Sequence, residues 1–176
     1  MTNLSLFQDL DCEPTRQQAG TPQALFDMLH GSCRFTVDAC AVEHNHKMDR
    51  YWSPIDDGLA QSWEGERVWC NPPYEDIGPW LAKGQTATLA AFLLPVRTDR
   101  QWWRRFKPLC ECHYFVGEKP HTRVQFVAPP GFEYSNNPDC NCLLCFGDGF
   151  TPGAERWRSG RTGELLPDGL SAGTRR

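Results

Sequence analysis

Apolar residues recur with a helical period at three places along the chain. The first, "TPQALFDMLHG", has Thr21 suited to be the N-cap, Pro22 as the first helical residue and Gly31 as a stop. Apolar residues at 77–81 have the same spacing. A third helix is predicted at 98–107, "TDRQWWRRFK", which opens on a Thr N-cap and has an Asp in its first turn.

Short apolar segments between these helices predict strands. "RFTVDAC" carries Asp38 near its end, and "RVWCN" ends in Asn71. The uninterrupted run at 88–96, "TLAAFLLPV", is typical of a central parallel strand. "RYWSP" at 50–54 predicts a further strand, and "DDGLAQSW" at 56–63 predicts a turn. Strands that alternate with helices indicate an α/β fold with a mainly parallel sheet.

The last third of the chain changes character. "CHYFVG", "RVQFVA" (123–128) and "NCLLCFG" predict short strands separated by Gly, Pro and Asn, which indicates antiparallel pairing at a sheet edge. Residues 1–20 lack periodicity, and the chain from Thr151 is rich in Gly, Arg and Pro. We therefore expect a flexible arm at 1–20, one folded domain at 21–150 and a tail at 151–176.

Composition is ordinary for a soluble globular chain and adds three constraints. The net charge of −4 means that the chain as a whole is not basic, so binding to a nucleic acid requires local basic patches. No apolar run approaches the ~20 residues of a membrane span, and the start of the chain lacks a signal-peptide core, which predicts no membrane partner and a cytoplasmic location. Nine Cys, an odd number, predict mostly reduced thiols. No obligate protein partner is indicated.

The stretch "VWCNPPYEDIGPW" places polar groups where a strand ends. In an open parallel sheet, ligands bind beyond the carboxyl ends of the strands, where Asp38, Asn71 and Arg97 would face one crevice. The Asn71 side-chain oxygen accepts a hydrogen bond. The Pro72 carbonyl has no competing ladder partner, because Pro73 lacks an N–H and keeps the residue before it extended.

Two adjacent acceptors can hold one NH₂ group, and the Tyr74 ring can lie on the plane that carries it. This arrangement suits an exocyclic amine on a flat heterocycle. Drawing both amine protons toward acceptors moves lone-pair density out of the ring plane, which makes the nitrogen a nucleophile. The alternative is a structural turn with a packed Tyr74.

The sequence N-P-P-Y after a strand resembles the [DNS]-P-P-[YFW] motif of amino-group DNA methyltransferases. The wider pattern resembles the small, phage-encoded, Dam-like DNA N6-adenine methyltransferases. The matching stretches occur in the order of that family and span most of the chain; they are "TPQALFDML", "FTVDACA", "DGLAQSW", "VWCNPPYEDIGPWLAKG", "LLPVRTDRQWW" and, more loosely, "HTRVQFVAPPGF" and "CLLCFGDG". The resemblance implies a Rossmann-like fold, S-adenosyl-L-methionine as methyl donor and double-stranded DNA as partner.

The resemblance also implies roles for individual residues. Asn71 and the Pro72 carbonyl would bind the N6 amine of a flipped adenine, with Pro73 holding the turn and Tyr74 stacking on the base. No general base is needed before transfer, because the amine can lose its proton afterwards. The cofactor-binding residues implied by the resemblance are Thr21, Pro22, Phe26, Asp38, Ala39, Cys40, Asp57, Leu59 and Asn71.

Three features depart from the pattern of many such enzymes. The segment after the first strand, "DACAVEHN", contains no Gly. Residues 39–70 are too few for a full set of alternating strands and helices, so the outer strands must be short or missing. We find no separate target-recognition domain. Two residues have simpler alternatives, since Asp38 can cap a following helix and Asp57 can be an ordinary turn acid.

Basic residues gather in two segments that could contact DNA phosphates. A solvated helix face is the alternative for the first segment. The DNA-binding residues we predict are Arg97, Arg100, Arg104, Arg105, Lys119 and Arg123.

The Cys residues raise the question of a zinc site. "CEC" and "CNCLLC" would supply five thiolates near His113, but neither has two C-x₂-C knuckles, and Cys142 and Cys145 would point to opposite faces of a strand. We therefore expect no metal and buried free thiols. His44 and His46 are expected in a solvated segment.

The expected function is site-specific adenine-N6 methylation of DNA. The family resemblance suggests protection against restriction as its purpose. Methylation of cytosine N4 by the same fold is the nearest alternative. A catalytically idle relative that binds DNA or a host protein is another, and a small zinc-dependent nucleic-acid-binding module is a third.

Overall fold

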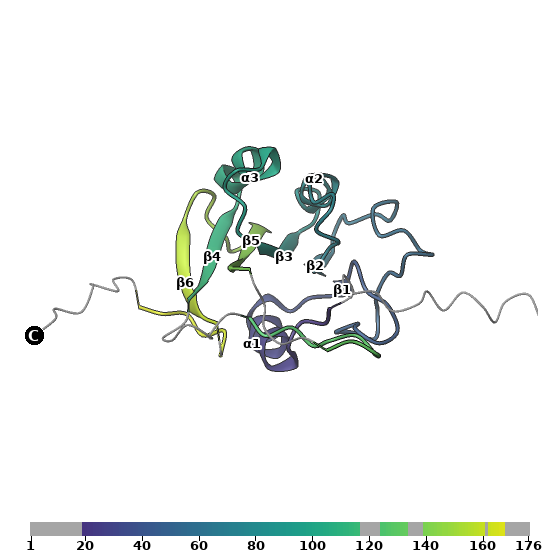
Figure 1. The fold of residues 1–176 in the computed structure, drawn as a ribbon. Coiled ribbons are helices and arrows are strands. Elements are labelled where there is room, and N and C mark those ends of the chain that lie inside the picture. The colour runs from purple at the N-terminus through teal and green to yellow at the C-terminus, as the bar shows by residue number, and fades with distance from the viewer. Residues whose placement is uncertain (1–18, 117–123, 134–138, 161, 168–176) are drawn as a thin grey trace, which may run out of the picture.

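The computed structural model describes residues 19–116, 124–133, 139–160 and 162–167. These residues form one six-stranded sheet with α1 on one face and α2 and α3 on the other (Figure 1). The elements follow in the order α1 (Gln23–Cys33), β1 (Val37–Asp38), β2 (Arg67–Cys70), α2 (Gly78–Gly84), β3 (Leu89–Pro95), α3 (Gln101–Phe106), the 3-10 helix η3 (Lys107–Leu109), β4 (Glu111–Val116), β5 (Asn141–Gly147) and β6 (Glu155–Ser159).

The sheet confirms the expected α/β class. Its strand order is β1-β2-β3-β5-β4-β6, and β5 is antiparallel to both of its neighbours, whereas the other pairs are parallel. Five strands therefore run in one direction and β5 runs against them. The outer strand β1 is only two residues long, as the short interval before Asn71 predicts.

The apolar run at β3 explains the layered architecture. Every residue of this strand is buried, and its side chains alternate between two cores. Phe92 packs with α2 and α3, whereas Leu93 packs with α1. A central strand covered on both faces needs apolar residues at every position, which is why its sequence does not alternate with polar residues.

Helix α1 is shifted from its predicted bounds. Its N-cap position is Pro22, with extended backbone and no side-chain cap, so the Thr21 cap is wrong. The helix also passes Gly31 and ends at Cys33, because Cys33 continues the buried face of the helix. Arg67 Nε then donates a hydrogen bond to the Cys33 carbonyl at 2.6 Å, which satisfies one of the carbonyls left open at the helix end.

Helix α3 also begins later than predicted. Its N-cap position is Arg100 rather than Thr98, and no side chain caps it. The residues of α3 that are buried against the sheet are Trp103 and Phe106, whereas Trp102 is only partly buried. Neither α3 nor any other helix of the described residues has the length and apolar character needed to cross a membrane.

Two predicted strands are single bridges in the structure. Within 50–54, only Tyr51 pairs, in a parallel bridge with Asp38. Of the second segment the structure describes 124–128, where only Val127 pairs, in an antiparallel bridge with Gly20. Conversely, β6 lies in the predicted tail, so the sheet continues beyond residue 150. The sequence of β6 gave no strand signal because its buried residue, Arg158, is charged.

Buried charges hold β6 to the sheet. Arg158 Nε donates to His113 Nδ1 at 2.7 Å, so the His113 proton resides on Nε2, which lies 2.8 Å from Glu111 Oε1. Burial, together with the positive charge of Arg158, lowers the pKa of His113 to about 4. Arg158 Nη1 also donates to the Gly163 carbonyl at 2.8 Å. A neutral His113 thus links a buried cation to a buried anion across β4 and β6.

Candidate active site

The carboxyl ends of β1 and β2 meet at one edge of the sheet. Asp38 is in register with Trp69, and Asn71 follows β2 directly. Parallel pairing thus places the Asp38 and Asn71 side chains on the same face of the sheet, where both line one pocket. Arg97, which was predicted to face the same crevice, does not line this pocket. Pro72 is buried, whereas Tyr74 is 38% exposed.

Both ends of the Asn71 amide have hydrogen-bond partners. Its Nδ2 donates to the Ala19 carbonyl at 3.1 Å, and its Oδ1 accepts from the Tyr74 hydroxyl at 3.2 Å. The first bond fixes which way the amide faces. Because an amide oxygen has two lone pairs, Oδ1 can accept a second hydrogen bond while Tyr74 is in place.

The carbonyl that fixes Asn71 belongs to the segment predicted to be a loose arm. Gly20, the next residue, exchanges two backbone hydrogen bonds with Val127, at 2.9 and 2.8 Å. Residues 19–20 are thereby anchored to a segment far away in the sequence. Sequence reasoning missed this contribution, since a single bridge leaves no periodic pattern.

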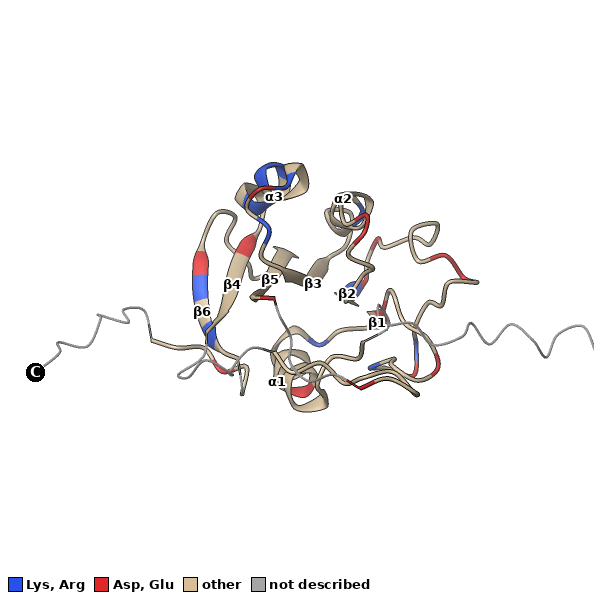
Figure 2. Ribbon diagram, in the orientation of Figure 1, with Lys and Arg blue, Asp and Glu red and all other residues tan. Residues whose placement is uncertain are grey.

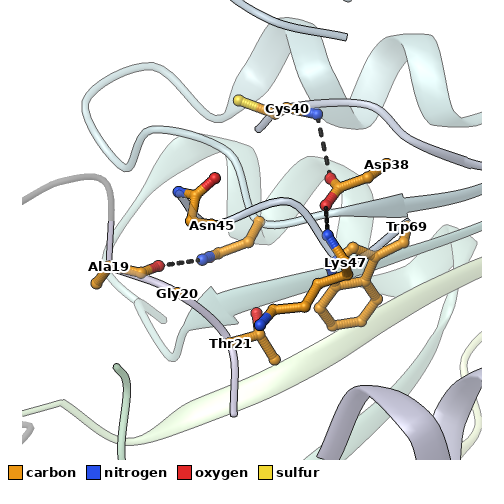
Figure 3. Close-up of a pocket in the computed structure, with 9 residues that line it drawn as sticks. Ala19, Gly20, Thr21, Asp38, Cys40, Asn45, Lys47 and Trp69 are labelled. Atoms are coloured by element: carbon orange, nitrogen blue, oxygen red, sulfur yellow. Dashed lines mark hydrogen bonds between the residues drawn. The ribbon is translucent and has the colours of Figure 1, made fainter. Parts of the chain in front are cut away.

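A pocket lined in part by Asn71 opens to solvent at this edge, and about 190 Å³ of space, open solvent included, lies within it. Figure 3 shows its other lining residues. Four of its lining residues were predicted to bind the cofactor: Thr21, Asp38, Cys40 and Asn71. The others were not predicted: Ala19, Gly20, Asn45, Lys47 and Trp69. The pocket is open to solvent and too small to enclose a large cofactor, so its residues could contact only one part of such a ligand.

Asp38 is the buried acid of this pocket. It is only 2% exposed, and its two oxygens accept backbone N–H bonds from Cys40 at 3.4 Å and from Lys47 at 3.1 Å. Burial raises the pKa of Asp38 to about 7, even though both hydrogen bonds and the charge of Lys47 act in the opposite direction. Residues 41–49 form turns and bends, so the alternative of Asp38 as a helix cap is wrong.

The segment that encloses Asp38 was expected to be simply solvated. Asn45 and Lys47 instead line the pocket. Asn45 Oδ1 accepts the Val42 N–H at 2.8 Å, which folds the segment into a turn. The His46 ring stacks on Tyr51 with centroids 4.6 Å apart. A polar segment without periodicity gives no sequence signal for such an arrangement.

Two predicted cofactor residues lie beside the pocket rather than in its lining. Phe26 is buried in the core, with its ring centroid 5.6 Å from that of Trp69, which does line the pocket. Pro22 is partly buried at the start of α1, next to the lining residue Thr21. Phe26 therefore supports one wall of the pocket from behind.

The turn that carries Asp57 and Leu59, both predicted to bind the cofactor, packs against Ala39, a third predicted cofactor residue. Gly58 lies so close to Ala39 that a Cβ atom on Gly58 would be 2.1 Å from the Ala39 carbonyl oxygen. Trp63 Nε1 donates to the Gly58 carbonyl at 2.8 Å and holds the turn in place. Asp57 has a φ of 50°, and its Oδ1 accepts the Leu59 N–H at 3.1 Å, which fits the turn-acid alternative. Neither Asp57 nor Leu59 lines the pocket.

The predicted DNA-binding residues differ in their surroundings. Arg97 forms an ion pair with Asp139 at 2.8 Å, and Arg100 lies 3.4 Å from Asp99. Arg104 and Arg105 are exposed on α3, where Figure 2 shows basic residues along the helix. The remaining two predicted residues, Lys119 and Arg123, lie outside the described residues.

The cysteines of the described residues are free thiols. Cys110 and Cys112 are buried, and Cys142 and Cys145 pack into the cores on opposite faces of the sheet, as their spacing predicts. Cys140 is exposed, contrary to the expectation of burial. No three His, Cys, Asp or Glu side chains of the described part of the chain are grouped to hold a metal ion.

Two comparisons with known proteins match this chain. The family model described as DNA N-6-adenine-methyltransferase (Dam) matches residues 11–152, which is most of the chain. A DNA N-6-adenine-methyltransferase of Haemophilus phage HP1 (strain HP1c1) is 29% identical over 75 residues, covering 40% of this chain and 43% of that relative. The match to the relative thus spans less than half of either protein. Because the family model covers more than half of the chain, the chain belongs to the DNA N-6-adenine-methyltransferase (Dam) family.

Proposed function

We propose that this protein transfers a methyl group from S-adenosyl-L-methionine to the N6 amine of a flipped adenine in double-stranded DNA. The observation that carries the proposal is the placement of Asn71. Its oxygen is held as an acceptor by the Ala19 carbonyl, and its side chain lines the same pocket as the buried acid Asp38.

The pocket residues suit one end of the proposed cofactor. Asp38 supplies a carboxyl group that a ligand ammonium would hold in its charged form, Lys47 a positive charge and Trp69 an aromatic wall. A molecule whose amino-acid end carries both a carboxylate and an ammonium group matches this set of charges. When bound, S-adenosylmethionine supplies an electrophilic methyl group. The residues around it position the two reactants and exclude water, which is enough for a transfer that needs no preceding deprotonation.

The base-binding residues act on the amine. The free lone pair of Asn71 Oδ1 accepts one amine proton, and we assign the second to the carbonyl of Pro72. Tyr74 is exposed and adjacent, so its ring can turn from Asn71 onto the extruded base. Base stacking of about 1–3 kcal/mol offsets much of the few kcal/mol that flipping costs.

DNA would approach along the carboxyl edge of the sheet. The exposed Arg104 and Arg105 provide the local positive surface that a chain of net charge −4 requires for contact with phosphates. The phage relative suggests a bacteriophage context, and we place the activity in the cytoplasm of a bacterial host, with protection against restriction as its purpose.

One assay separates the candidate functions. Purified protein is incubated with mixed-sequence duplex DNA and labelled S-adenosylmethionine, and the nucleosides are analysed by mass spectrometry. N6-methyladenine supports the proposal, whereas N4-methylcytosine selects the nearest alternative. If neither product forms and calorimetry detects no cofactor binding, both the proposal and its nearest alternative are refuted.

A variant pair tests the role of Asn71. Asn71→Ala removes the acceptor and should abolish transfer while cofactor binding and the circular dichroism spectrum are retained. Asn71→Asp keeps an acceptor oxygen but loses the hydrogen bond to the Ala19 carbonyl, so its transfer should be weaker than that of the unaltered protein and stronger than that of Asn71→Ala. Loss of folding in Asn71→Ala would instead favour the structural-turn alternative.

A further inference from the structure

Lys47 is a cation of the pocket whose ammonium is not in direct contact with a carboxylate of the described residues. It lines the pocket and is partly buried, and no ion pair within the described part of the chain includes it. Its ammonium lies 3.4 Å from Gln23 Oε1, which is long for an N–H···O hydrogen bond. Gln23 is also engaged elsewhere, since its Nε2 donates to Asp27 at 2.8 Å.

The surroundings of Lys47 leave its charge incompletely solvated. Burial lowers the pKa of Lys47, and this effect exceeds the opposing influence of the nearby Asp38 and Asp27 carboxylates. An ammonium that has lost water without gaining a close anionic partner is pre-organised to receive an anion.

The course of the side chain defines where that anion would lie. The backbone N–H of Lys47 is bonded to Asp38, whereas the side chain extends toward Thr21 (Figure 3). The pocket therefore has an acid at its inner wall and an ammonium nearer the start of α1. A zwitterionic amino-acid group carries the two complementary charges.

We propose that Lys47 binds the carboxylate of the methionine moiety of the cofactor. This inference rests on the proposed function and adds a cofactor-binding residue to it. The carboxylate–Lys47 contact would hold the amino-acid end at the pocket that Asn71 also lines. The cofactor is thus oriented by charge at one end.

Two ligands that differ only in the carboxylate provide the test. S-adenosylhomocysteine carries the complete amino-acid group, and its decarboxylated analogue keeps the amine but lacks the carboxylate. For Lys47→Met we expect the Kd of S-adenosylhomocysteine to rise about 10- to 100-fold, as for the loss of a charge-assisted hydrogen bond. The Kd of the decarboxylated analogue should change by no more than about twofold, and Lys47→Arg should recover most of the loss.

Lys83→Met, on α2 and outside the pocket lining, is the matched control and should leave both Kd values unchanged. An equal loss for both ligands in Lys47→Met would overturn the proposal in favour of a structural role. An unchanged Kd for S-adenosylhomocysteine would overturn it as well, while the proposed function stands. If the unaltered protein binds neither ligand, the proposed function is refuted together with this inference.

Discussion

The buried acid Asp38 should make cofactor binding depend on pH. Burial raises the pKa of Asp38 to about 7 in the unliganded protein. Asp38 lines the pocket, so a ligand ammonium placed there would favour the carboxylate and lower that pKa again. At a pH where Asp38 is protonated in the unliganded protein, binding would then require Asp38 to lose its proton. We expect Asp38→Asn, which cannot ionise, to remove this dependence.

The size of the effect follows from the pKa of about 7. About nine-tenths of Asp38 is protonated at pH 6 and about one-tenth at pH 8, so the affinity for S-adenosylhomocysteine should rise about tenfold over that interval. The neighbouring thiols do not titrate there, because burial raises the pKa of Cys40 to about 12 and that of Cys70 well above its usual value. Lys47, the other charged group near Asp38, is controlled for by repeating the titration with Lys47→Met.

Isothermal calorimetry from pH 6 to pH 8, in buffers of different ionisation enthalpy, measures both the affinity and the protons released. Asp38→Asn should bind more weakly with a flat profile and release no proton. A flat profile for the unaltered protein, or the same slope in Asp38→Asn, would refute the reasoning.

The raised pKa of Asp38 also predicts how the free energy of unfolding depends on pH. The pKa of Asp38 is raised on folding, so its contribution is fully present below the unfolded pKa of about 3.9 and is lost as the pH rises through about 7. Between pH 5 and pH 8, the unfolding free energy of the unaltered protein should fall by about 3 kcal/mol relative to that of Asp38→Asn. Urea unfolding of both proteins at the two pH values measures this difference, and parallel curves would contradict the buried-acid assignment.

Three further perturbations address separate parts of the site. Gly58→Ala places a Cβ atom against the Ala39 carbonyl and should lower the unfolding free energy by about 1–3 kcal/mol in urea titrations; unchanged stability would show that the turn can move. Tyr74→Ala should weaken binding of duplex DNA about 10- to 100-fold in fluorescence anisotropy through loss of stacking, whereas Tyr74→Phe, which keeps the ring, should stay within about threefold. The double substitution of Arg104 and Arg105 by Ala should reduce the slope of log K against log salt for DNA binding by about 1.8, and an unchanged slope would leave α3 without a phosphate contact.

The edge that carries Asp38 and Asn71 could be predicted from the sequence alone. Both residues end short apolar segments, and the carboxyl ends of neighbouring parallel strands lie at one edge of a sheet. The structure confirms this part of the reasoning through the register of Asp38 with Trp69. The apolar run of β3 predicted the central strand for an equally local reason, since both of its faces are covered.

The remaining parts of the site depend on pairings that sequence patterns do not record. Ala19 fixes Asn71 through one carbonyl, and its own position depends on the bridge between Gly20 and Val127. Lys47 is placed by the hydrogen bond from its backbone N–H to Asp38, whatever its side chain is. Single contacts between residues distant in sequence leave no periodicity, so they become visible only in the folded chain.

The glycine-poor segment after β1 finds a physical explanation in the same contacts. A glycine-rich loop lets the backbone approach a ligand closely, but here the segment turns back on its own acid, with the Cys40 and Lys47 N–H groups directed at Asp38. The close approach that glycine permits occurs instead at Gly58, against the Ala39 carbonyl. The charge of Asp38 therefore does two things, since it would attract a ligand ammonium and it strengthens the two hydrogen bonds that hold the segment closed. Cofactor binding and the order of this segment should accordingly be coupled through one carboxylate, so the affinity lost in Asp38→Asn should exceed the loss of a single ligand contact.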